Sequence, residues 1–351
     1  MATTFAVPDG RVAMAATLWA GTNATNSISN TVNTVSFQPD FVWLKDRTQA
    51  QYHTLYDSVR GSGSARSLIL PLTDAEGGQS NLYGYLSSFN SNGFTLTPGS
   101  TSSAWVNASG DNYVGWQWKA GGTAISNTAG SITSSVSANT TAGFSVVTYT
   151  GTGANATVGH GLGVAPAFII FKGRTNVSNW WCYHSGLTSA AYTISLNQTS
   201  AQSNNPTSFQ STAPALTVFS IGTDGGTNST AIPTVAYCWA PVAGYSAFGS
   251  YTGNGSTDGP FIYTGFRPRW LMIKSSSAVE NWYVWDSSRD VYNAESAQLY
   301  PNLANAEASA VSIDANSNGF KCRSATVVNT SAATYIYAAF AENPLKYANA
   351  R

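Results

Sequence analysis

Apolar residues along this chain recur mostly at every second position, in short runs separated by stretches rich in Gly, Asn, Ser and Thr. A period of two places alternate side chains on one face of a strand, whereas a helix would need apolar residues three or four positions apart. Helical spacing is nearly absent. The pattern therefore predicts an all-β chain of many short antiparallel strands.

One pattern occurs three times along the chain. It consists of a proline, one free position, four apolar residues and a lysine, and its copies are Pro39–Lys45, Pro166–Lys172 and Pro268–Lys274. Four successive apolar residues predict a central strand that is covered on both faces. Each copy is followed by an aromatic strand, and these three strands end at Trp118, Trp239 and Phe340. Because order and spacing both recur, the sequence predicts a threefold internal repeat.

The repeats divide the chain into four parts. We expect a first repeat with a short lead-in at 1–120, a linker at 121–143, a second repeat at 144–244, and a third repeat with a C-terminal tail at 245–351. The linker has no charge and little bulk, which predicts a flexible segment or one draped over the surface. Seven or eight short strands per repeat predict antiparallel β-sandwiches of jelly-roll-like topology.

Two further landmarks recur. Leu55–Arg60 matches Val284–Arg289, while Cys182–Leu187 in the middle repeat keeps the aromatic residue and loses both charges. Asn90–Phe94 is repeated letter for letter at Asn316–Phe320. Its Asn-Gly pair predicts a hairpin with a type I′ turn, because both residues accept a positive φ at low cost.

Charge limits the range of partners. Only 9% of the residues are charged, and Lys+Arg equals Asp+Glu at 16 each. A balanced and sparse charge argues against nucleic acid and against anionic membrane surfaces, which both attract a concentrated positive face. No apolar stretch is long enough for membrane insertion, and the first residues lack the features of a secretory signal. The three cysteines are expected to be buried free thiols rather than a disulfide framework.

Two groups of side chains are candidates for ligand binding. Charged pairs that follow a strand beside an aromatic ring suit a receptor or sugar site, and tryptophan rings suit stacking on a glycan. Alternatively, the charged pairs fix a loop and the rings pack in the core, which the repetition favours. The weak binding candidates are Tyr56, Asp57, Arg60, Trp180, Trp282, Trp285, Asp286 and Arg289.

The residues that carry catalysis or bind metals are sparse. The three histidines have no metal-ligand spacing. The segment from Asp314 opens like a calcium loop, but Ala325 stands where the closing glutamate belongs, so a hairpin turn is the better interpretation. Glycosidases need two facing carboxylates, and the second repeat offers only Asp224, although a single site elsewhere stays open. We therefore expect no enzymatic activity, no metal and no cofactor.

Several stretches together resemble a unit found in bacteriophage virion proteins, especially tail-fibre proteins of marine and cyanobacterial phages. They are Pro39–Arg47, Tyr56–Gly61, Phe89–Leu96 and Asn112–Gly122, with flanks at Phe5–Met14 and Ala338–Pro344. The resemblance covers nearly the whole chain and carries no catalytic residue. It implies a virion structural protein that is assembled in the host cytoplasm and is extracellular in the mature particle.

The resemblance also suggests partners. We expect other virion proteins, or a glycan or receptor on the host cell surface, to be bound by a tail-fibre or adhesin module. Fibre proteins are often trimeric, so we expect a homotrimer, with threefold pseudo-symmetry inside one chain as the alternative. Two other functions stay open: a capsid-decorating or adaptor protein, and a polysaccharide depolymerase.

Overall fold

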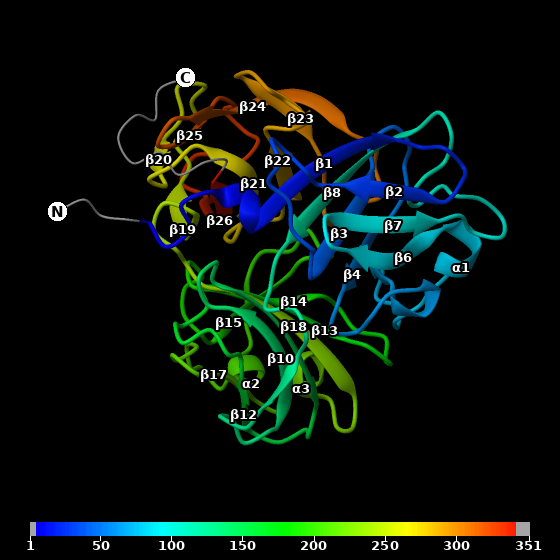
Figure 1. Cartoon of the computed structure of the whole chain (residues 1–351). Coiled ribbons are helices and arrows are strands. Elements are labelled where there is room, and N and C mark those ends of the chain that lie inside the picture. Colours follow the sequence, from blue (N-terminus) through cyan, green and yellow to red (C-terminus); the bar gives the residue numbers. More distant parts are fainter. Residues whose placement is uncertain (1–4, 342–351) are drawn as a thin grey trace.

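The computed structural model describes residues 5–341 and consists almost entirely of antiparallel strands (Figure 1). The all-β prediction is confirmed. The strands form six sheets, which we group into unit 1 (β1–β8), unit 2 (β9–β18) and unit 3 (β19–β26). The expected C-terminal tail at 342–351 lies outside the described residues.

Each unit has one large sheet. In unit 1 its order is β1 (Met14–Ala20), β8 (Asn112–Trp118), β3 (Phe41–Asp46), β4 (His53–Asp57) and β5 (Leu68–Leu70). In unit 2 it is β16 (Ser203–Asn204), β15 (Tyr192–Ser195), β14 (Trp181–His184), β13 (Phe168–Gly173), β18 (Pro233–Trp239), β11 (Phe144–Thr150), β10 (Ser134–Asn139) and β9 (Ile125–Asn127). In unit 3 it is β19 (Ser246–Thr252), β26 (Thr334–Ala341), β21 (Pro268–Ser275) and β22 (Trp282–Asp286).

Each unit also has a small sheet. These are β2 (Asn26–Ser29), β7 (Gly93–Thr97) and β6 (Tyr85–Asn90) in unit 1, β12 (Ala156–Gly159) and β17 (Val218–Ile221) in unit 2, and β20 (Phe261–Tyr263), β25 (Gly319–Cys322), β24 (Ala308–Asn316) and β23 (Glu295–Gln298) in unit 3. Within residues 5–341, helical structure is limited to single turns at η1 (Gly10–Val12), η2 (Ser64–Arg66), α1 (Ser80–Tyr83), α2 (Pro206–Phe209) and α3 (Gly225–Asn228).

The same four-strand order occurs in every large sheet. It reads β1-β8-β3-β4, β11-β18-β13-β14 and β19-β26-β21-β22. The three Pro-to-Lys segments form β3, β13 and β21, which have a partner strand on each side and are buried along their whole length. The prediction of central strands covered on both faces is therefore confirmed.

The two faces of β3 and of β13 belong to different cores, whereas both faces of β21 belong to one core. In β3, Val42 and Leu44 pack toward the small sheet of unit 1, whereas Phe41 and Trp43 belong to a core shared by all three units. Figure 1 shows the units grouped around a common centre. There the Trp118 ring lies 6.0 Å from that of Trp239 and 5.6 Å from that of Phe340. Large edge-to-face aromatic contacts thus join the units.

The segment 121–143 differs from the expected linker. It contains β9 and β10, and β10 pairs with β11 along Ser135–Asn139. Its residues are small, but Val136 is buried beneath the sheet. Strand pairing needs only backbone hydrogen bonds and one modest apolar face, so a Ser- and Ala-rich sequence can look like a linker.

The two predicted hairpins are present, but their turns are not type I′. The central residues are Ser91-Asn92 and Ser317-Asn318, and none of these has a positive φ. The glycine follows the turn and joins the ladder. A Cβ on Gly93 would lie 1.9 Å from the carbonyl oxygen of Ile28, so close approach of a neighbouring strand explains the glycine.

Candidate functional site

Asp57 and Arg60, two of the predicted binding residues, lie in a buried network between units 1 and 2. The Arg60 guanidinium contacts Asp57 through Nε and donates to Glu76 at 2.9 Å. From unit 2, Arg174 donates to the other oxygen of Glu76 at 2.8 Å, and the Tyr237 hydroxyl donates to Asp57 at 2.8 Å. Two arginines and two carboxylates are thereby paired away from water, with a hydrogen bond to nearly every oxygen.

The same arrangement recurs between units 3 and 1. Arg289 donates to Asp286 at 2.5 Å and to Glu307 at 2.8 Å. Arg47 of unit 1 completes the pair with Glu307 at 2.8 Å, and the Trp116 indole donates to Asp286 at 2.8 Å. Burial opposes ionisation of Glu307, but the hydrogen bonds from Arg47 and Arg289 hold its pKa below the ordinary value.

The third junction, between units 2 and 3, has no Asp–Arg pair among the described residues. His184 and Leu187 occupy the positions of the aspartate and arginine, and the His184 ring bonds the carbonyl of Tyr337 at 3.0 Å. The backbone contact persists: Gln202 N–H donates to Ser276 at 2.9 Å. At the other junctions the backbone N–H of Glu76 donates to the carbonyl of Arg174, and the backbone N–H of Glu307 donates to the carbonyl of Arg47. The backbone frame is therefore common to all three junctions, and only the side chains change.

The three repeated lysines connect the units in one direction around the centre. Each buried ammonium donates to a backbone carbonyl of another unit: Lys45 to Ala304 at 3.2 Å, Lys172 to Thr73 at 2.8 Å, and Lys274 to Thr199 at 3.1 Å. Unit 1 thus contacts unit 3, unit 2 contacts unit 1, and unit 3 contacts unit 2. Burial lowers the pKa of each lysine to about 8.

The residue eight positions after each lysine makes a second contact in the same direction. The ring nitrogens of these residues bond carbonyls of the neighbouring unit: His53 with Tyr300 at 3.0 Å, Trp180 with Leu72 at 3.1 Å, and Trp282 with Ser195 at 2.9 Å. Because the contacts run around the ring and return to their start, the three units form one closed arrangement rather than a row.

All eight predicted binding residues have buried side chains. Tyr56 and Trp285 are core residues, Trp180 and Trp282 face junctions, and the two Asp–Arg pairs fix junctions as well as their own loops. None of them offers a free surface on this chain to a ligand. The sequence missed Arg47, Arg174, Glu76 and Glu307. The two arginines could have been found, since each lies two residues after a repeated lysine.

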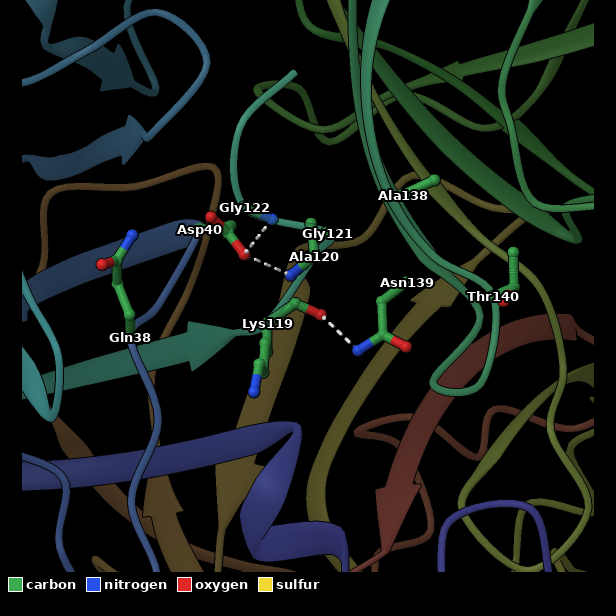
Figure 2. A pocket seen from close by; sticks show the side chains of 9 residues that line it. All are labelled: Gln38, Asp40, Lys119, Ala120, Gly121, Gly122, Ala138, Asn139 and Thr140. Atoms are coloured by element: carbon green, nitrogen blue, oxygen red, sulfur yellow. Dashed lines mark hydrogen bonds between the residues drawn. The ribbon is translucent and has the colours of Figure 1, made fainter. Parts of the chain in front are cut away.

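An open groove of about 480 Å³ runs along the seam of units 1 and 2 (Figure 2). The Asp40 carboxylate lies in its wall, accepting from the Ala120 N–H at 2.8 Å, the Gly122 N–H at 3.4 Å and the Ser58 hydroxyl at 2.7 Å. Burial raises the pKa of Asp40. One Asp40 oxygen bonds Ser58 within unit 1 and the other bonds the backbone that leads into unit 2, so both oxygens of this carboxylate are already engaged.

The three histidines share one hydrogen-bonding state. In His53, His160 and His184, Nδ1 accepts an N–H, from the Trp43 indole in the first case and from the backbone in the others. The Nε2–H therefore donates to a carbonyl, which fixes the neutral tautomer. Burial lowers the pKa of all three, that of His184 to about 4.

The other carboxylates and cysteines considered from the sequence also serve structural roles. Among residues 5–341, no group of three His, Cys, Asp or Glu converges as a metal site. Asp314 pairs with Arg323 at 3.1 Å. The cysteines are buried free thiols, and Cys182 and Cys238 belong to different cores on opposite faces of one sheet. Within this described range, no helix has the length and apolarity needed to cross a bilayer.

Comparison with known proteins gives one match. Searches of curated proteins and of solved structures found no significant similarity. The model of a domain of unknown function, DUF7483, matches residues 13–344, from the start of the first large sheet past the end of the last. Because this match spans nearly the whole chain, the protein belongs to the DUF7483 family.

Proposed function

We propose that this chain is a non-enzymatic structural protein of a bacteriophage particle. It would act as a tail-fibre or adhesin module that binds the host surface or neighbouring virion proteins. The observation that carries the proposal is the closed set of junctions, in which the two Asp–Arg pairs and the three repeated lysines, together with His53, Trp180 and Trp282, make contacts between units. A rigid, sparsely charged body of this kind suits assembly and adhesion better than a reaction that needs free acids and bases.

The proposal includes a finer description of the fold. We infer three tandem jelly-roll-like β-sandwich repeats derived from one ancestral unit. The recurring strand order and the directional lysine contacts support it. An asparagine also recurs in each unit, at Asn107, Asn228 and Asn329, where its side-chain amide donates to a carbonyl in the loop that follows β1, β11 or β19. The closed ring favours pseudo-symmetry within one chain over the homotrimer, which stays a prediction.

The capsid-decorating or adaptor role is the second candidate. A single chain with three similar units around one centre matches a threefold position on a symmetric partner. The depolymerase alternative requires two free facing carboxylates. Asp57, Glu76, Asp286 and Glu307 are all paired with arginine, which weighs against their use in hydrolysis.

The test is the location and copy number of the protein in purified phage particles. Particles from a phage that encodes this chain would be quantified by mass spectrometry and imaged with a labelled antibody. Labelling at the tail tip, with few copies, supports the fibre role. A copy number near that of the capsid subunit, with labelling over the head, supports decoration. Absence from purified particles would refute both.

A further inference from the structure

The outer face of the small sheet of unit 3 displays two aromatic rings. β20 is an edge strand of three residues, with Ile262 pointing into the core. On either side of it, Phe261 is 46% exposed and Tyr263 is 69% exposed. Figure 1 shows β20 and β25 at the periphery of the molecule, away from the centre where the units meet. The rings thus lie outside the junctions that hold the units together.

The other two units show what the fold itself requires at these positions. The inner residue of the edge strand pairs with a phenylalanine in every unit: Ile28 with Phe94, Val158 with Phe219, and Ile262 with Phe320. The flanking outer residues are Ser27 and Ser29 in unit 1, Thr157 and Gly159 in unit 2, and Phe261 and Tyr263 in unit 3. The strand therefore forms without aromatic residues, so the fold does not account for the two rings.

The surroundings leave the rings open. Gly319 lies opposite Tyr263, and a Cβ on Gly319 would come within 2.9 Å of the Phe261 ring. The absence of a side chain there lets that ring lie against the sheet. Residues two apart on a strand are about 6.6 Å apart and point to the same face, so both rings lie on the outer face of the sheet; we call this pair of rings the platform.

The charges beside the platform are balanced. Lys321, which is opposite Phe261, pairs with Asp258 at 2.5 Å, and Arg323 pairs with Asp314 at 3.1 Å. These four side chains sum to zero charge and offer both hydrogen-bond donors and acceptors. A charged ligand would gain no net attraction from them, whereas an uncharged ligand with hydroxyl groups and apolar C–H faces matches both the rings and the polar rim.

We propose that Phe261 and Tyr263 form a binding site for a neutral saccharide on the outer face of unit 3. The apolar ring faces stack on the C–H faces of the sugar, and the paired charged side chains bond its hydroxyl groups. This site deepens the proposed adhesin role and rests on it, since it names the surface and the class of ligand that such a module would use.

The experiment is an array of neutral, sialylated and sulfated oligosaccharides probed with the full chain. We expect binding to neutral oligosaccharides. The double variant Phe261→Ser with Tyr263→Ser carries the outer serines of unit 1, so the strand should still form. It should reduce binding by about tenfold or more. Tyr292→Ser is the matched control, because Tyr292 is 82% exposed and precedes β23 at the other edge of the sheet. It should bind like the parent.

Other outcomes would overturn the inference. Binding only to charged glycans, binding unaffected by the double variant, or no binding at all would each refute it. Light scattering tests whether a second copy of this chain occupies the face instead. If the parent is oligomeric and the double variant is monomeric, the face joins copies of this chain and the saccharide site is refuted. All of these results are compatible with a protein that is present in phage particles. The composition of purified particles therefore tests the proposed function separately from this binding site.

Discussion

The buried Arg60 provides the sharpest test of the junctions. Its side chain is fully buried and bonded to Asp57, Glu76 and Tyr237. Leu187 occupies the matching position in unit 2, so Arg60→Leu introduces a residue that this framework already accepts. The substitution leaves the Asp57 carboxylate buried without its counter-charge. Unit charges about 4 Å apart interact by about 4 kcal/mol at an effective dielectric constant of 20. Removing one partner of a buried pair costs about 3–5 kcal/mol.

Guanidinium unfolding followed by tryptophan fluorescence would measure this loss. Arg66→Leu is the control, because Arg66 also lies 3.9 Å from Glu76 but its side chain is 44% exposed, so its loss should stay within about 0.5 kcal/mol. Adding Asp57→Asn to Arg60→Leu removes the unpaired charge and should restore a large part of the stability. A loss below about 1 kcal/mol for Arg60→Leu, or no recovery in the double variant, would refute the reasoning.

Three further predictions concern the core and the histidines. Because the folded state holds His184 neutral with a pKa of about 4 against an ordinary value of 6.5, the unfolded chain takes up its proton first as the pH falls. The parent should therefore lose up to about 3 kcal/mol more stability than His184→Gln between pH 6.5 and 4, and parallel pH profiles would contradict this. Trp118→Ala should destabilise by about 3–5 kcal/mol, whereas Leu216→Ala, at an exposed position, should have little effect. Calorimetry should show one cooperative transition, since the three units share a core, and three separate transitions would contradict the closed arrangement.

The sequence predicts the strands well where the apolar pattern is dense. The four apolar residues of β3, β13 and β21 predicted central strands, whereas the pairing of these strands with the closing aromatic strands became visible only in the structure. The pattern could not say what covers each face, because Val42 and Trp43 are equally apolar although one faces its own unit and the other faces the common centre. Which units meet is set by three-dimensional packing over large sequence separations. The local hydrophobic periodicity does not indicate which units come into contact.

The sequence pattern did not predict features that depend on small side chains or on residues that differ between the units. β10 was missed because serine and alanine give a weak alternation. The sequence does not reveal Asn107, Asn228 and Asn329 as one equivalent set, because the neighbours of Asn228 differ from those of the other two. The Asp–Arg pairs were found by their repetition, but their partners from other units were not. Those partners lie far away in the chain, and nothing in the spacing alone joins Arg47 to Glu307.

The different side chains at the junction between units 2 and 3 have a consequence for how such a ring can change. In an assembly of three identical copies, every substitution at a contact appears three times at once, so a costly exchange of Asp and Arg for His and Leu would be multiplied around the axis. Fusion into one polypeptide removes that constraint. Each seam of this chain can differ from the others, and the seam that contains His184 has no Asp–Arg pair of the kind found at the other two.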